Sequence, residues 1–410
     1  MRGRDIVGAT RRFMLAAGLA TSAALAATAF QAQAQAPSGP PIRIGSTLAL
    51  TGPLAQTGAI HKIVGDLFVA QLNARGGLLG RPVEWVLLDD QSKPDITRTL
   101  YERLITVDKV DLIIGPYATA GILSAMAVAQ RYNKVLVHST FGIPKMAAYD
   151  RQFPAWPLGI DPEKTMPNDL LDALASIGKT PKSIAIVTSK FPSVQFVAVG
   201  AREVAKARGV KEALYLEFEF GTRDFGPIAA RVREADPDLL FVGAIGLEGN
   251  QLLEALDKLN YKPRNHFYVY PTPGPLATSP LGNDAMATTA FETLPPLNKN
   301  PEAAAFAKAF TEAATKAGLP YTEPETQAGA SWSMWEILTG AIKATKSLDD
   351  KVLADHIKKN GSDTVLGHIS FDGQNNYGKN LMRTKQVQQG KWVIIWPKDM
   401  ITPGYTVQGK

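Results

Sequence analysis

The residues best suited to acid–base chemistry are two adjacent carboxylates and one histidine. Asp89 and Asp90 directly follow a strand-like run, and paired carboxylates there can act as acid and base or bind Mg²⁺. The same side chains can instead shape a strand-to-helix turn through hydrogen bonds to nearby amides, and we favour this interpretation. His138 ends another strand-like run, where a structural or ligand-lining histidine is more common than a catalytic base.

The composition argues against thiol chemistry and against a metal site built from cysteine or histidine. The chain has no cysteine, which excludes a disulfide framework, a thiolate metal site and a cysteine nucleophile. Its five histidines show none of the paired spacings typical of metal ligands. We therefore expect no metal, no cofactor and no catalytic residue. An enzyme that uses Asp89 with Asp90, or His138, is the alternative from a different functional class.

Four loops rich in glycine, serine and threonine offer another kind of chemistry. They follow strand-like runs, at residues 51–58, 115–121, 139–142 and 189–195. In α/β sheets, ligands bind beyond the carboxyl ends of the strands, where helix N-termini present unpaired amides. Hydroxyls and amides at these places can bind a carboxylate without a counter-charge. Short loops also contain such residues for purely structural reasons, so composition leaves both interpretations open.

Two series of short strands and longer helices position these loops. The strands of the first series are expected at residues 42–48, 83–88, 112–114 and 135–139. Those of the second series are expected at residues 184–188, 213–218, 239–243 and 266–270. A proline-rich break at 153–157 separates the series, and the tail is expected to form a hairpin with its turn at Asp372 and Gly373. This alternation predicts two α/β lobes with parallel sheets covered by helices on both faces.

The first 36 residues have the composition of an export signal. A basic segment with Arg11 and Arg12 precedes an uncharged, alanine-rich stretch at 15–29, and Ala32 and Ala34 supply the small residues that signal peptidase needs. The arginine pair resembles a twin-arginine signal, and an ordinary Sec signal with two arginines is the alternative. We expect residues 1–36 to be a cleavable signal peptide and the mature protein to reside in the periplasm.

Length and charge bound the remaining possibilities. The chain has 410 residues and a formal charge of +6, and this length favours two domains. The first 36 residues carry four arginines and one aspartate, a net of +3, so +3 remains on the mature chain. So small a surplus gives no reason to expect a nucleic-acid partner. We expect a monomer, since no feature of the sequence indicates self-association.

Five stretches in the same order resemble the branched-chain amino-acid binding family of periplasmic solute-binding proteins, which deliver ligands to ABC importers. They are residues 44–54, 72–81 (LNARGGLLGR), 89–94 (DDQSKP), 113–117 (IIGPY) and 370–373 (SFDG). The resemblance implies an ABC permease in the inner membrane as partner. A ligand-sensing subunit that docks on a receptor or regulator is the alternative, because the same fold serves that role too.

The resemblance implies a type I fold, in which two doubly wound α/β lobes are joined by a three-segment hinge. The N-terminal lobe is expected to contain residues 37–159 plus 292–366, and the C-terminal lobe residues 160–291 plus 367–410. The three crossings are expected near residues 156–160, 291–294 and 365–367. Two such lobes close on a ligand like a hinged jaw.

The resemblance also implies which residues bind the ligand. Thr119 matches the hydroxyl that binds the ligand's carboxylate, with the amides of Ala118 and Ala120 beside it. Thr140 matches a residue that binds through its backbone. The full set expected in the ligand site is Gln56, Thr57, Ala118, Thr119, Ala120, Ser139, Thr140, Phe141, Gly142, Phe191, Ile245 and Tyr270.

One departure from the family bears on the ligand. The amino-acid binders commonly place an acid, which pairs with the ligand's ammonium, after the strand that ends here at Tyr270, whereas residues 271–274 read PTPG. A buried ammonium without a partner is costly, so we hypothesise a carboxylic acid without an α-amino group, such as an aromatic acid. The alternative is an amino acid whose ammonium pairs with Glu248 or another acid. The aromatic side chains expected to stack on the ligand are Phe141, Phe191, Trp156 and Tyr270.

Overall fold

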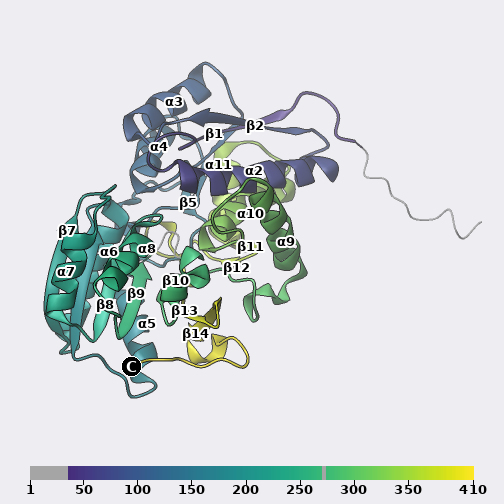
Figure 1. Ribbon diagram of the computed structural model, residues 1–410. Helices are drawn as coiled ribbons and strands as arrows, with labels where there is room; N and C mark the ends of the chain where they lie inside the picture. Colours follow the sequence, from purple (N-terminus) through teal and green to yellow (C-terminus); the bar gives the residue numbers. More distant parts are fainter. Residues whose placement is uncertain (1–35, 270–273) are drawn as a thin grey trace, which may run out of the picture.

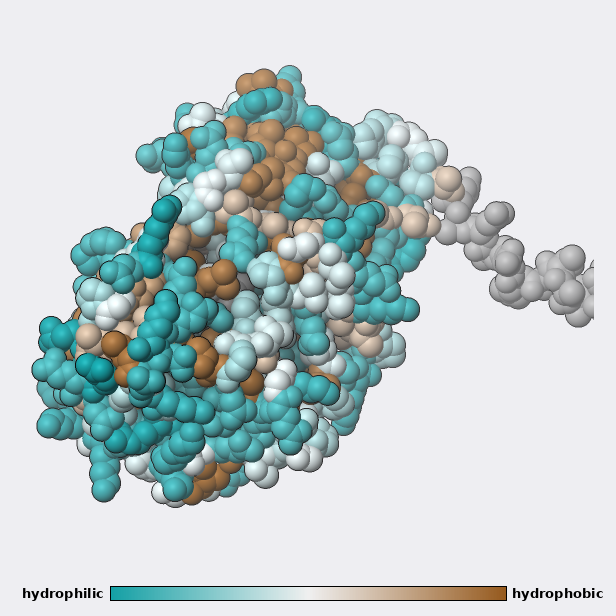
Figure 2. All heavy atoms as spheres, viewed as in Figure 1, coloured by the Kyte–Doolittle hydropathy of each residue, from teal (hydrophilic) through white to brown (hydrophobic). Residues whose placement is uncertain are grey.

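The structure, a computed structural model, describes residues 36–269 and 274–410 (Figure 1). The expected signal peptide therefore lies outside the described residues except for Ala36, and so does Tyr270. The face of the molecule seen in Figure 2 is mostly hydrophilic. Of the helices in the described part of the chain, none is both long enough and apolar enough to cross a membrane.

The first lobe is built on a five-stranded parallel sheet with the strand order β2-β1-β3-β4-β5. Its strands are β1 (Ile42–Leu48), β2 (Val83–Asp89), β3 (Leu112–Ile114), β4 (Leu136–His138) and β5 (Gln152–Pro154). The helices of this lobe are α2 (Ala55–Ala74), α3 (Pro94–Thr106), α4 (Thr119–Arg131), α9 (Pro301–Lys316), α10 (Thr326–Thr345) and α11 (Asp350–Asn360). The central strands β1 and β3 are buried along almost their whole length, as a parallel sheet covered on both faces requires.

The second lobe is built on a seven-stranded sheet with the order β14-β13-β10-β9-β8-β6-β7. Its strands are β6 (Ser183–Ser189), β7 (Lys211–Phe218), β8 (Leu239–Gly243), β9 (Asn265–Val269), β10 (Met286–Thr289), β13 (Arg383–Gln388) and β14 (Lys391–Trp396). Its helices are α5 (Pro162–Ala175), α6 (Pro192–Ala207), α7 (Gly226–Ala235) and α8 (Glu248–Lys258). The strands from β7 to β10 are parallel, and β13 and β14 add an antiparallel hairpin at one edge.

Each sheet reverses its direction of winding at one pair of neighbouring strands. In the first sheet the chain moves from β1 to one side for β2, and then to the other side for β3 and the strands after it. In the second sheet the same reversal separates β6 from β8. Loops that leave such a pair diverge to opposite faces of the sheet, and the crevice between them is where open α/β sheets bind ligands.

The prediction of two α/β lobes is confirmed, and two local expectations are wrong. Residues 153–157, expected as a break, contain the end of the edge strand β5, which accepts Pro154 because an edge residue need not donate to a neighbouring strand. The expected turn at Asp372 and Gly373 does not join the terminal strands. That turn lies at Gln389 and Gly390, whose φ angles of 54° and 73° suit a tight hairpin.

The contacts of residues 371–377 suggest a later position for the third crossing between the lobes. The short hairpin of β11 (Ser362–Thr364) and β12 (Gly367–Ile369) is followed by residues that still pack on the first lobe. Asn376 donates to the carbonyl oxygens of Asp150 and Gln152, at 2.8 Å each. The chain joins the second sheet only at β13, so we propose residues 378–382 as this crossing in place of residues 365–367.

Candidate ligand-binding site

A small cavity lies between the two lobes, where loops from the winding reversals of both sheets meet. Its lining residues are Tyr117, Ala118, Thr140, Trp156, Phe191, Ser193, Ile245 and Gln327. Four of the predicted residues, Ala118, Thr140, Phe191 and Ile245, are thus brought together. None of the described residues that line this cavity has a charged side chain.

The N-terminus of α4, which follows Ala118 of this cavity wall and borders the neighbouring cavity lined by Ala120 and Gly121, presents unpaired amides. The first hydrogen bond of the helix runs from the Ile122 amide to the Ala118 carbonyl oxygen, at 2.9 Å. Across the described parts of the chain, no acceptor lies within hydrogen-bonding distance of the amides of Thr119, Ala120 and Gly121. Because these amides lie at the positive end of the helix dipole, they form a site that favours an anion.

Two hydrogen bonds join the loop before α4 to the loop after β4. The Thr119 hydroxyl accepts from the Gly142 amide at 3.1 Å, and the Thr140 hydroxyl accepts from the Ala118 amide at 3.0 Å. Both threonines are buried. Each hydroxyl oxygen that accepts from an amide can still donate its own proton. The hydroxyl of Thr119 is therefore held in one orientation at the first turn of α4, and Thr119 itself is buried beside Ala118 without lining either neighbouring cavity.

Three residues of the cavity wall, Tyr117, Ser193 and Gln327, were not among the predicted site or stacking residues. Tyr117 makes side-chain hydrogen bonds with Thr57 and Gln327, and Gln327 Oε1 lies 3.1 Å from His61 Nε2. Burial lowers the pKa of His61 to about 4, against the opposing effect of its hydrogen bond with Gln327, so this imidazole is neutral at neutral pH. No local sequence pattern marks Gln327, because it lies in a stretch of α10, residues 326–335, in which every residue is buried.

The second lobe contributes the ring of Phe191 and the loop that carries Ile245, whose amide is already hydrogen-bonded within the lobe. Phe191 is the N-cap of α6, and its ring lies 5.2 Å from that of Phe220. Glu248 accepts from the Ile245 amide and the Gly221 amide, one on each carboxylate oxygen, at 2.9 Å each. Burial raises the pKa of Glu248. The carboxylate therefore stabilises the loop that carries Ile245, and it does not line the cavity between the lobes.

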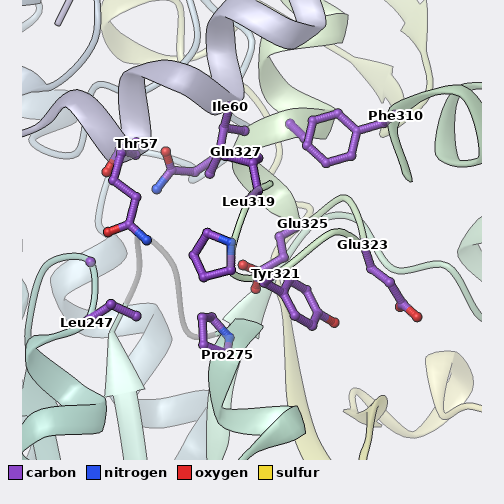
Figure 3. Close-up of a pocket in the computed structure, with 14 residues that line it drawn as sticks. Thr57, Ile60, Leu247, Pro275, Phe310, Leu319, Tyr321, Glu323, Glu325 and Gln327 are labelled. Atoms are coloured by element: carbon purple, nitrogen blue, oxygen red, sulfur yellow. The ribbon is translucent and has the colours of Figure 1, made fainter. Parts of the chain in front are cut away.

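A second cavity adjoins the first one, with Gln327 in the wall of both (Figure 3). Two predicted site residues, Gln56 and Thr57, lie in this second cavity. Most of its walls are apolar. Its lining residues are Gln56, Thr57, Ile60, Gly246, Leu247, Pro275, Phe310, Leu319, Pro320, Tyr321, Glu323, Glu325, Gln327 and Ala328.

The remaining predicted residues lie around these cavities rather than in them. Ala120 lines a third cavity on the outer side of α4, together with Ala118 and Phe191. Ser139 is buried behind Thr140. Phe141 is fully buried and packs edge-on against His138, with ring centres 5.6 Å apart, so its ring belongs to the core of the first lobe. Tyr270 lies outside the described residues.

The acidic pair holds two loops of the first lobe together. Asp89 accepts from the Thr51 hydroxyl at 2.6 Å and from the amides of Leu50, Thr51 and Gln91. Burial acts to raise the pKa of Asp89, but these hydrogen bonds outweigh it and lower the pKa. Asp90 accepts from the Thr47 hydroxyl at 2.7 Å, and burial raises its pKa. These contacts support the interpretation of both carboxylates as turn-shaping groups.

His138 is fully buried and lies 2.6 Å from Gln152, measured from Nε2 to Oε1. Burial lowers its pKa to about 4, although the hydrogen bond with Gln152 opposes this change. The ring lines none of the three cavities, which favours a structural role. Within residues 36–269 and 274–410, no group of three or more His, Asp or Glu side chains is placed to bind a metal ion.

Comparisons with known proteins agree with this architecture. The sequence signature of the family described as "Periplasmic binding protein" matches residues 41–391. The "Leu/Ile/Val-binding protein homolog 2" of Brucella abortus (strain 2308) is 25% identical over 344 residues, which cover 81% of this chain and 86% of that protein.

Two solved structures share the fold. The leucine-binding protein LivK of Thermotoga maritima MSB8 has a TM-score of 0.74 at 20% identity and covers 88% of this chain and 99% of its own. A solute-binding protein of an ABC transporter from R. palustris, in complex with benzoate, has a TM-score of 0.74 at 17% identity and covers 90% and 99%. With this signature across most of its length and two α/β lobes around a cavity, the chain belongs to the periplasmic binding protein family, in its branch of branched-chain amino-acid binding proteins.

Proposed function

We propose that this protein binds a small carboxylate between its lobes, with the carboxylate at the N-terminus of α4. The observation that carries the proposal is the group of unpaired amides at Thr119, Ala120 and Gly121, beside the donor proton of the Thr119 hydroxyl. No lysine or arginine is among the described residues that line the cavity. Amides and a hydroxyl at a helix N-terminus suit an anion that the protein must also release.

The ligand that fits this site best is an aromatic carboxylic acid. Tyr117, Trp156 and Phe191 supply ring surfaces to the cavity, and aromatic pairs gain energy beyond the burial of area. An α-amino acid would place its ammonium next to its carboxylate, where the described lining offers no carboxylate to receive it. The benzoate complex of the R. palustris relative supports this choice, and the Leu/Ile/Val-binding relatives support the amino acid that we rank second.

In the cell, we propose that the protein is a monomer that delivers its ligand to an ABC permease and performs no chemistry on it. Closure of the lobes on the ligand would produce the conformation that docks on the permease. Export would depend on residues 1–36 as a cleavable twin-arginine or Sec signal. The N-terminal sequence of the protein recovered from a periplasmic extract tests the cleavage, and gel filtration tests the monomer.

Titration calorimetry of the mature chain with benzoate, cinnamate and leucine tests the ligand class. We expect one aromatic acid to bind with one-to-one stoichiometry and leucine to bind at least about tenfold more weakly, a difference of about 1.4 kcal/mol. Chromatography of the recovered ligand should show no product. Leucine as the tighter ligand would refute the aromatic class, and turnover of any ligand would favour the enzyme alternative.

A further inference from the structure

Glu325 lines the second cavity, away from the proposed position of the ligand's carboxylate. Glu325 is the N-cap of α10 and is 8% exposed. Figure 3 shows its side chain directed among the residues that line the cavity, whereas the side chain of Glu323 points away from it. Glu325 lines only the second cavity, on the side of Gln327 that is remote from Ala118 and Thr140.

Glu325 belongs to a buried cluster with one negative charge in excess. The Lys385 ammonium lies 3.0 Å from an oxygen of Glu325 and 2.8 Å from an oxygen of Glu292. Lys385 is 1% exposed and Glu292 is 5% exposed. Within the described part of the chain, no other basic side chain lies within 4.0 Å of either carboxylate. Two buried carboxylates share one ammonium, and such a surplus is costly unless another donor relieves it.

The protein already stabilises the lysine of this cluster from its other side. The Lys385 ammonium lies 4.3 Å from the centre of the Trp392 ring, an arrangement that stabilises a cation. Burial raises the pKa of Glu292, because the opposing effect of Lys385 does not outweigh it. The cluster therefore has a fixed cation and a surplus acceptor, and Glu325 is its one member that lines the cavity.

The shape of the second cavity suits the far end of an aromatic ligand. Ile60, Phe310 and Leu319 form an apolar wall above Glu325 (Figure 3). A ligand with its carboxylate at α4 would pass Gln327 to reach this space. An apolar cavity with one convergent polar group is the usual way in which a protein binds an apolar ring and fixes its orientation.

We propose that the second cavity binds the distal end of an aromatic carboxylic acid, and that Glu325 accepts a hydrogen bond from a hydroxyl or amino group carried at that end. This inference rests on the proposed function, since it takes the ligand's carboxylate to lie at α4. The ligand class is an aromatic acid with a donor para to its carboxyl-bearing chain, for which 4-hydroxycinnamate is a probe. The α-ammonium of an amino acid lies beside its carboxylate and would not reach Glu325.

Titration calorimetry with cinnamate, 4-methylcinnamate and 4-hydroxycinnamate tests the inference on the mature chain. We expect the wild type to bind the hydroxylated acid at least about tenfold more tightly than the other two, because a hydrogen bond to a charged acceptor is stronger than one between neutral groups. In Glu325→Leu the three affinities should fall within about threefold of one another. This variant leaves Lys385 and Glu292 as a balanced pair, so we expect it to fold.

Two further variants keep the test decisive. Glu323→Leu changes an exposed carboxylate at the rim of the same cavity, and it should retain the preference for the hydroxylated acid. If Glu325→Leu fails to give the cooperative thermal unfolding of the wild type, Glu325→Gln replaces it, with an expected loss of at least about threefold in that preference.

Different outcomes separate the inference from the proposed function. Equal binding of cinnamate and 4-hydroxycinnamate by the wild type, or an unchanged preference in Glu325→Leu, overturns the inference and leaves the proposed function in place. Absence of binding by every aromatic acid overturns both. Leucine binding that disappears in Glu325→Leu also overturns the inference, because Glu325 would then pair with an α-ammonium.

Discussion

The two halves of the ligand cavity differ in how their backbone amides are used. On the side of the first lobe, the amides of Thr119, Ala120 and Gly121 have no acceptor in the described parts of the chain. On the side of the second lobe, the Ile245 amide is already bonded to Glu248. The first half thus has spare donors on a fixed framework, and the second half presents mainly a ring and an apolar side chain.

This difference assigns separate tasks to the lobes. Unpaired donors on a rigid loop can bind a carboxylate before the lobes close, because the hydrogen bonds that hold Thr119 and Thr140 lie within the first lobe. In the proposed function, Phe191 and Ile245 reach the ligand only on closure, so we expect them to select the part of it that is not the carboxylate. We therefore expect the anion to provide affinity in the open state and the remainder of the ligand to determine whether closure is favourable.

Removal of the Thr119 hydroxyl should have the largest effect on binding. Thr119→Val takes away a donor to the ligand's carboxylate and the acceptor of the Gly142 amide. Hydrogen bonds to charged groups contribute about 1.5–3 kcal/mol, so affinity for an aromatic acid should fall about 10- to 100-fold in calorimetry. Thr99→Val, the same change on the exposed face of α3, is the control and should bind like the wild type. Unchanged affinity in Thr119→Val would move the carboxylate away from α4.

A change in the second lobe should have a smaller and more selective effect. Phe191→Leu keeps an apolar side chain at the cavity but removes the ring. Aromatic contacts contribute about 0.5–1.5 kcal/mol beyond area burial, so affinity for benzoate or cinnamate should fall about 2- to 10-fold. A ligand without a ring, such as leucine, should be affected less. An equal loss for both ligand types would mean that Phe191 acts through the shape of its loop alone.

The fold could be predicted because each strand is a short apolar run and each helix a longer periodic one. Runs such as residues 112–114 and 239–243 show where their strands begin and end, since a strand covered on both faces is apolar along its length. The third crossing could not be placed in this way. Residues 371–377 associate with the first lobe through contacts of Phe371 and Asn376 that no local pattern encodes.

The same distinction applies to the site. Ala118 and Thr140 follow strands of the first sheet, and position at the carboxyl ends of parallel strands is enough to suggest them. Gln327 and Glu325 come from a helix that returns to this lobe about 200 residues later, so only the tertiary structure brings them to the cavity. Phe141 was predicted to contact the ligand, but its ring is fully buried in the core of the first lobe. The sequence alone does not show which way a ring beside a ligand loop points.

The thermal stability of the protein should depend on pH through a buried carboxyl group in each lobe. In the first lobe, Glu336 accepts from the Val365 amide at 2.9 Å and from the Trp332 indole at 3.0 Å. Burial raises its pKa to about 7 from an ordinary value of 4.5. A raised carboxyl pKa favours the folded state when the group is protonated, so this contribution is complete below about pH 4.5 and is lost as the pH rises through about 7.

The Tm of the ligand-free protein should therefore include a contribution that falls between about pH 4.5 and pH 7, and Glu336→Gln should remove it. The expected difference between wild type and variant in this pH response is about 2–4 °C, followed by scanning calorimetry. In the second lobe, Asp169→Asn should remove a separate contribution that falls between about pH 4 and pH 6, since burial raises the pKa of Asp169 from 3.8 to about 6. A pH response that is unaltered in Glu336→Gln would assign it to other groups.

We expect the smallest effect on binding from a change in the acidic pair, Asp89 and Asp90. Both belong to the first lobe, and neither lines the cavity between the lobes. Asp90→Asn keeps the size of the side chain but weakens its bonds to the Thr47 hydroxyl and the Ser92 amide. The free energy of unfolding should fall by about 1–2 kcal/mol. Affinity for an aromatic acid should stay within about twofold, because the framework around Thr119 and Thr140 does not depend on Asp90. Denaturant unfolding and calorimetry on one preparation separate the two quantities. A tenfold loss of affinity at unchanged stability would make Asp90 a ligand contact, and the first lobe would then offer an acceptor as well as donors.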